Sequence, residues 1–257
     1  MRTKCTLSRR LCLTKYVNRD DGPLRVSTQA LVFSAAEYCA PVWSRSPHAK
    51  KVDVAINNAL RIITGCLKST PIVLLSVLAG IAPAGLRREA ATLALARKAR
   101  KHDWHILHNT TETAAPLSRL KSRHPYNKAA QDLLRSTTED LSKDGWLAAA
   151  WKQEWERAGP TQIHHYILDP GDGATGDDLP RRQWTLLNRL RTGVGRFKSS
   201  MKKWGLADSA ACECGAPEQT VQHIMTTCPL HRPPSEAGLF DVGPETRAWL
   251  QDTELDL

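Results

Sequence analysis

The sequence has few of the residues that build β-sheets. It contains only three Phe and four Tyr in 257 residues, and runs of β-branched residues are short, whereas Leu and Ala are abundant. Aromatic and β-branched side chains favour strands, while Leu and Ala favour helices. The composition therefore argues against a sheet-based domain and predicts a mainly α protein.

Long apolar stretches are also missing. No uninterrupted run of 18 apolar residues occurs, which argues against a membrane-spanning helix. The basic residues 1–10 are not followed by the apolar segment of a signal peptide. We therefore expect a soluble, intracellular protein of the cytoplasm or nucleus, with no membrane partner.

Acidic residues are scarce in two regions. Residues 1–110 contain 18 Lys or Arg against 6 Asp or Glu, and residues 181–203 contain eight bases and no acid. After Trp204 the balance reverses, with nine acids against two bases. Such regions predict a polyanionic partner, because each neutralised phosphate releases counterions. The alternative is a basic surface that only keeps the protein soluble, and composition does not separate the two.

Seven cysteines are an odd number for a disulfide framework, and three of them lie close together beside a histidine. Cys212, Cys214, His223 and Cys228 supply three thiolates and one imidazole, the ligand set of a tetrahedral zinc site. Gly215 permits a tight turn after the first pair. Because all four ligands are protein side chains, we expect one structural Zn²⁺ per chain and no catalytic metal.

Proline, glycine and capping residues divide the chain into helices. Helical spacing predicts a helix over 26–43, kinked or ended by Pro41, that buries Leu31, Ala35, Tyr38, Cys39 and Val42. Further helices are expected over 47–64, 71–79, 83–108, 129–141, 146–158 with Asp144 as N-cap, 180–190 and 196–204. Residues 109–128 are expected to be a linker, and the glycine-rich residues 169–178 a flexible loop.

An ordered set of short motifs resembles a known family. The motifs are residues 31–43, 60–66, 70–71, 78–83, 179–181, 190–193, 204–205 and 212–230. Together they resemble the region beyond the catalytic palm in reverse transcriptases of non-LTR retrotransposons, of the jockey and LINE kind. The resemblance implies a thumb-like helical bundle (1–110), a linker and helical connector (111–178), basic helices with a Cys3His zinc knuckle (179–232) and an acidic C-terminal tail (233–257).

Catalysis is not expected from this chain. The resembled enzymes are RNA-directed DNA polymerases whose palm carries a Phe/Tyr-Ala-Asp-Asp turn, and this motif is absent. The two Asp-Asp pairs, Asp20-Asp21 and Asp177-Asp178, border Gly or Pro and do not lie in an apolar strand hairpin. A nuclease following the knuckle is not expected either, because no Lys follows Cys228. The chain is interpreted as a C-terminal piece without the palm.

The resemblance implies binding to RNA or DNA. The candidate phosphate contacts, expected to act without sequence readout, are Arg181, Arg182, Arg189, Arg191, Arg196, Lys198, Lys202 and Lys203. The alternative is a structural or protein-interaction module, derived from a retroelement, that carries the same zinc site. The basic cluster 97–101 is expected to face solvent or nucleic acid instead of serving as a nuclear localisation signal. Trp146, Trp151 and Trp155 are expected in the core.

Overall fold

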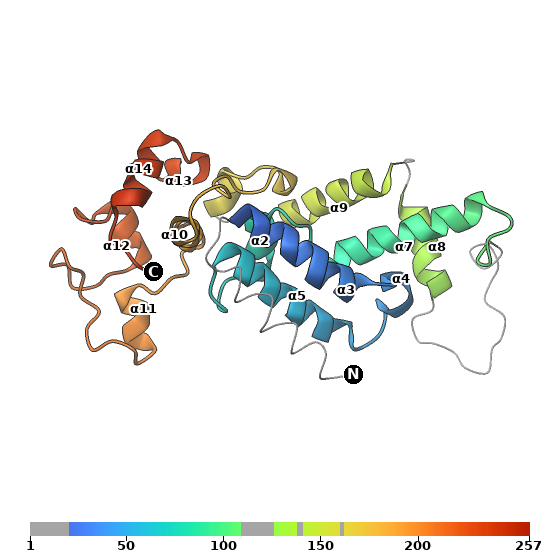
Figure 1. The fold of residues 1–257 in the computed structure, drawn as a ribbon, viewed down its shortest axis with the longest axis horizontal. Coiled ribbons are helices and arrows are strands. Elements are labelled where there is room, and N and C mark those ends of the chain that lie inside the picture. Colours follow the sequence, from blue (N-terminus) through green and yellow to red (C-terminus); the bar gives the residue numbers. More distant parts are fainter. Residues whose placement is uncertain (1–20, 109–125, 138–140, 160–161) are drawn as a thin grey trace.

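Helices make up the regular structure of this protein. A computed structural model describes residues 21–108, 126–137, 141–159 and 162–257, and within these ranges the chain forms helices and no strands. None of the helices in these ranges is both long and apolar enough to cross a membrane. Figure 1 shows an elongated molecule with the C-terminal helices at one end. The predicted mainly α class is confirmed.

The N-terminal part is a bundle of helices ended by glycine and proline signals. Its elements are α2 (Asp21–Thr28), the π-helical turn η1 (Gln29–Phe33), α3 (Ser34–Glu37), α4 (Ala40–Trp43), α5 (Ala49–Thr64), α6 (Ile72–Ala79), α7 (Ala84–Lys101), α8 (Tyr126–Ser136) and α9 (Lys143–Arg157). Gly65 and Gly80 adopt left-handed conformations where α5 and α6 end, as the sequence predicted. The helices α5 and α6 bury a shared core that includes Ile56 and Leu75.

The predicted helix over 26–43 is wrong in its continuity and in its buried face. The chain passes through η1 and then breaks at Cys39, whose φ is +51°. Pro41 lies in the first turn of α4, where its missing N–H costs nothing. A π-helical turn holds an extra residue, so the side chains after it rotate out of the expected register. Tyr38, Cys39 and Val42 are exposed after the turn, and within it Leu31 is exposed while Phe33 is buried.

Helix α9 differs from its prediction at its N-cap and carries two buried tryptophans. The N-cap of α9 is Ser142, whose Oγ accepts the N–H of Gly145 at 3.0 Å, and Asp144 lies inside the first turn instead. Trp146 is only half-buried, whereas Trp151 and Trp155 are buried, as predicted. They form a second core with α6 and the 3₁₀ turn η3 (Gln162–His165).

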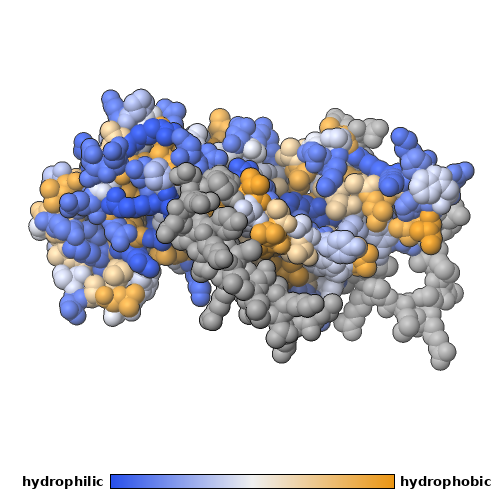
Figure 2. Space-filling view, viewed as in Figure 1, coloured by the Kyte–Doolittle hydropathy of each residue, from blue (hydrophilic) through white to orange (hydrophobic). Residues whose placement is uncertain are grey.

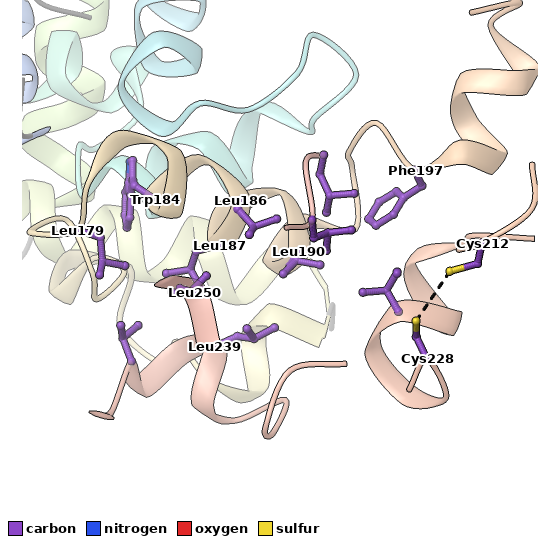
Figure 3. Packing of buried hydrophobic residues seen from close by; sticks show 14 residues of the cluster. Leu179, Trp184, Leu186, Leu187, Leu190, Phe197, Cys212, Cys228, Leu239 and Leu250 are labelled. Atoms are coloured by element: carbon purple, nitrogen blue, oxygen red, sulfur yellow. Dashed lines mark hydrogen bonds between the residues drawn. The ribbon is translucent and has the colours of Figure 1, made fainter. Parts of the chain in front are cut away.

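The C-terminal part is organised around one helix. Its elements are η4 (Pro170–Asp172), α10 (Arg181–Thr192), α11 (Lys198–Lys203), α12 (Val221–Thr226), α13 (Gly238–Asp241) and α14 (Pro244–Asp252). Leu186, Leu187 and Leu190 of α10 project into a third core, which Figure 3 shows together with Leu239 and Leu250. Residues 233–257, expected as an acidic tail, are thus folded against α10. Their charged residues occupy exposed positions between buried leucines.

The glycine-rich segment 169–178 is packed between the cores. Ala174 contacts all three buried clusters. An added Cβ at Gly173 would lie 3.4 Å from the Cα of Gly80, so this loop approaches the end of α6 closely. The segment therefore joins the two parts of the molecule, although its composition predicted a flexible loop.

Arg191 is the most deeply buried cation of α10, with 4% of its surface exposed. Its guanidinium donates to the carbonyls of Leu239 and Thr175 at 2.7 and 2.8 Å, and to Asn188 Oδ1 at 3.2 Å. Burial lowers the pKa of Arg191 to about 9, which still leaves the side chain charged at neutral pH. Arg191 therefore links α10 to both the glycine-rich loop and α13.

Replacing Arg191 should destabilise the C-terminal part. Arg191→Met removes the charge but leaves two buried carbonyls without donors, so we expect a loss of about 3 kcal/mol in the free energy of unfolding. Arg196→Met is the matched control, because Arg196 is exposed and should change stability by less than about 0.5 kcal/mol. Urea unfolding followed by circular dichroism measures both. Equal midpoints for the two variants would show that Arg191 does not stabilise the fold.

Candidate metal centre

The four predicted ligands converge on one point. The Sγ atoms of Cys212, Cys214 and Cys228 and a ring nitrogen of His223 all lie within 4.8 Å of one another. The two sulfurs of Cys212 and Cys228 are 3.8 Å apart (Figure 3), and Cys214 Sγ lies 3.2 Å from His223 Nε2. Ligand atoms on a tetrahedral zinc ion are separated by about 3.5 to 3.8 Å. The cluster can therefore hold a metal ion and is compatible with zinc.

A tight turn presents the first pair of cysteines. The N–H of Cys212 donates to Ala216 O at 2.9 Å, and the N–H of Gly215 donates back to Cys212 O at 3.0 Å. Gly215 has a φ of +92°, a conformation that glycine adopts without strain. The turn brings the side chains of Cys212 and Cys214 to the same side of the backbone, as the sequence predicted for Gly215.

A short capped helix presents His223. Thr220 is the N-cap of α12, and its Oγ1 accepts the N–H of His223 at 3.1 Å. The ring Nδ1 lies 2.9 Å from Thr227 Oγ1. When Nδ1 carries the proton and donates it to Thr227, the lone pair of Nε2 faces the sulfurs, which is the tautomer that a metal requires.

The pKa values of the Cys212 and Cys214 thiols are shifted in opposite directions. Burial raises the pKa of the Cys212 thiol to about 11, so without an ion this buried sulfur keeps its proton. The backbone N–H of Ala216 lowers the pKa of Cys214. A bound cation favours the thiolate form of every ligand, and binding releases the thiol protons.

Gln219 connects the metal loop to α11. Its backbone carbonyl accepts the N–H of Ser199 at 3.2 Å, and its Oε1 accepts the N–H of Lys198 at 3.0 Å. These two N–H groups belong to the first turn of α11, where no intrahelical partner exists. On the other side, Gln219 Nε2 lies 3.9 Å from Cys212 Sγ. The position of α11 is thus fixed by the loop that carries the ligands.

Four of the eight candidate phosphate contacts bind the protein's own backbone. Arg181 and Arg189 donate to carbonyls at the end of α5, and Arg182 donates to Thr253 O at 2.8 Å. Arg191 is buried, as described above. The burial of Arg191 does not fit the predicted phosphate contact, because a phosphate could reach its guanidinium only if the third core opened.

The other four candidates lie nearer the surface. Arg196, Lys202 and Lys203 are exposed, while Lys198 is half-buried and its Nζ lies 2.6 Å from Glu213 Oε1. Figure 2 shows mainly hydrophilic residues over this end of the molecule. The accessible bases of residues 181–203 are thus Arg196, just before α11, and Lys202 and Lys203 at its end.

Trp204 was not among the sequence-based candidates. It follows Lys202 and Lys203 directly, and 48% of its surface is exposed. Gly205, with a φ of +70°, ends α11 by donating its N–H to Lys202 O. Trp204 comes immediately after an acid-free basic run, and this position is the signal that could have identified Trp204 from the sequence.

Of the two Asp-Asp pairs, only Asp177-Asp178 lies wholly within the described residues. The carboxylate of Asp178 accepts hydrogen bonds from both terminal nitrogens of Arg247, at 2.8 and 3.1 Å. These bonds lower the pKa of Asp178. Asp177 lies in the turn before Leu179. Asp20 lies outside the described residues, and Asp21 begins α2.

Comparison with known proteins points to a mobile element. Over 85 residues, 33% of this chain, the sequence is 26% identical to the retrovirus-related Pol polyprotein from type-1 retrotransposable element R1 of Bradysia coprophila. This match supports a retroelement origin. The aligned part is only 8% of that polyprotein's length. No protein-family model and no solved structure matches the chain.

Removing one ligand should empty the centre. We expect Cys214→Ser to lower bound metal from one ion per chain to near zero, because a closed site with three ligands binds far more weakly. Cys39→Ser is the matched control, since Cys39 is an exposed free cysteine outside the cluster. Metal analysis of freshly reduced protein gives the count. Equal metal content in both variants would contradict the assignment of Cys214 as a ligand.

Proposed function

We propose that this chain is a non-catalytic, nucleic-acid-binding unit related to the C-terminal region of a non-LTR retrotransposon reverse transcriptase. In this proposal the N-terminal bundle corresponds to the thumb, α8 and α9 to the connector, and the cysteine cluster to the zinc knuckle. One observation carries the proposal. The first turn of α11, the helix that carries Lys202 and Lys203 and is followed by the exposed Trp204, is hydrogen-bonded to Gln219 in the loop of the four candidate ligands.

The ion in this proposal is a structural Zn²⁺. Three thiolates and an imidazole favour zinc over calcium or magnesium, which prefer oxygen ligands. Four protein ligands leave no open position for water or substrate. When bound, the ion closes the loop between Cys212 and Cys228 and supplies no reactive group.

The metal loop acts on the binding surface through Gln219. The closed loop fixes Gln219, and Gln219 caps the first turn of α11. The helix then carries Lys202 and Lys203 into solvent, with Trp204 at its end. Lysines at this position attract phosphates, and an exposed indole offers a flat face to an unpaired base. Such contacts bind RNA or DNA with little sequence preference.

Acidic residues limit this surface on one side. Glu254 and Asp256 line the same hollow as Arg196 and Lys198. A phosphate entering the hollow would meet both signs of charge, whereas the outer face of α11 presents only bases. We therefore assign the phosphate contacts to Lys202 and Lys203, flanked by Arg196.

Reversing these charges should weaken binding uniformly. Arg196→Glu/Lys202→Glu/Lys203→Glu should lower affinity for RNA and DNA of any sequence. It should also reduce the slope of log affinity against log salt concentration by about two to three, the value for three phosphate contacts. Fluorescence anisotropy with labelled oligonucleotides at several salt concentrations measures both effects.

The control must change the net charge by the same amount at another place. Lys50, Lys51 and Lys128 are exposed and lie on α5 and α8. Changing all three to Glu should alter binding much less. If both triple variants lose affinity equally, overall charge and not α11 determines binding. If the protein binds no nucleic acid at low salt, the protein-interaction alternative replaces this proposal.

DNA synthesis is not expected from this chain. Nucleotidyl transfer needs carboxylates that hold two divalent ions about 3.5 to 4 Å apart. Asp178 is instead engaged by Arg247. A primer-extension assay with magnesium or manganese should show no product. Extension that survives stringent purification and disappears in Asp177→Asn/Asp178→Asn would contradict this prediction.

A further inference from the structure

The loop after α7 presents apolar side chains beside a basic helix end. Trp104 is 72% exposed and Ile106 is 91% exposed. The last turn of α7 carries Lys98, Arg100 and Lys101, all exposed. Figure 1 places this end of α7 at the opposite end of the molecule from α11, and Figure 2 shows apolar and hydrophilic residues side by side there. The surface is thus separate from the one described above.

The loop is a folded element that displays its tryptophan. His105 donates its N–H to His102 O at 3.0 Å, and His108 donates its N–H to His105 O at 2.8 Å. The ring of His108 contacts Ala99 O at 3.0 Å, which ties the loop back to α7. The rings of His102 and His105 lie 5.1 and 6.0 Å from that of Trp104. Two successive turns therefore hold Trp104 in an outward position.

Helix stability alone explains only part of this arrangement. Cations in the last turn of a helix interact favourably with its dipole, so the three bases need no ligand to account for them. The indole is different, because leaving it in water forgoes the gain from burying a large apolar side chain. An exposed tryptophan beside three bases is the combination used to bind single-stranded nucleic acid.

We propose that the last turn of α7 and the loop 102–108 form a second contact site, specific for single-stranded nucleic acid. An unpaired base stacks on Trp104, and the phosphates beside it contact Lys98, Arg100 and Lys101. A duplex is a poor ligand here because its base faces are already stacked on one another. This inference rests on the proposed nucleic-acid binding and adds a second site and a strand preference to it.

The test uses the full, metal-loaded chain and a labelled oligothymidine strand. Trp104→Ala should lower affinity for the single strand about tenfold, the effect of losing one base–aromatic stack. Trp104→Phe should retain most of the affinity, because it keeps a stacking face. Ile106→Ala is the matched control, since Ile106 is an even more exposed apolar residue of the same loop and cannot stack on a base. Binding to a duplex should be the same in all three variants.

A direct readout separates stacking from indirect effects. In protein labelled with 5-fluorotryptophan, the ¹⁹F resonance that is missing from Trp104→Phe belongs to Trp104. This resonance should shift when the oligothymidine strand is added. An unchanged resonance would overturn the proposal.

The remaining outcomes distinguish this proposal from the proposed function. If Trp104→Ala binds the strand normally while the α11 triple variant does not, the second site is wrong and the nucleic-acid function stands. If neither variant loses affinity, both fail. If Ile106→Ala weakens binding as much as Trp104→Ala does, the loop is a general apolar contact, and the stacking proposal is overturned.

Discussion

The C-terminal end of α5 depends on α10 for its hydrogen bonds. The last carbonyls of a helix have no partner within the helix, and α10 supplies the donors from its side chains. These donors are Arg181 and Trp184 to Ile63 O, Asn188 to Thr64 O and Arg189 to Gly65 O, at 2.8 to 3.0 Å. Gly65 permits this close approach because it has no Cβ. A Cβ at this position would lie only 2.2 Å from Thr185 Oγ1 and would clash with it. Since α10 is also the central helix of the third core, this contact joins the two parts of the molecule.

Sequence reasoning succeeded where the determining contacts are local. The ends of α5 and α6 follow from glycines at the next position, and the metal ligands follow from donor types spaced within one short segment. It failed where the partner is distant in the chain. Arg181 binds a carbonyl 118 residues away, and no pattern within residues 181–203 reveals that acceptor. The prediction of a continuous helix over 26–43 failed for another reason. Periodicity arguments assume a constant number of residues per turn, and the π-helical turn η1 breaks that assumption.

The metal centre is local in its ligands but not in its surroundings. Cys212 and Cys228 are buried in the same core as Leu187 and Leu250. The cluster is therefore continuous with the packing of α10. Because Gln219 belongs to the same loop, any ordering of the loop by an ion reaches α11 through two hydrogen bonds. A site determined by short-range spacing is thus linked by hydrogen bonds to a helix outside it.

Within residues 181–203 the two kinds of base have separate roles, and their chemistry explains why. A planar guanidinium donates several hydrogen bonds in fixed directions and loses less hydration than an ammonium group, so it suits buried carbonyls. The four arginines of α10 all donate to backbone oxygens, whereas Lys202 and Lys203 remain in solvent. Arg196 is the exception, and it lies outside the helix that caps α5. Each of the four arginines of α10 has a Trp or Leu three or four positions away on that helix, and an arginine with such a neighbour is better interpreted as an internal hydrogen-bond donor. By that criterion Arg191, which follows Leu187 by four positions, is an internal donor, as its bonds to Leu239 O and Thr175 O show.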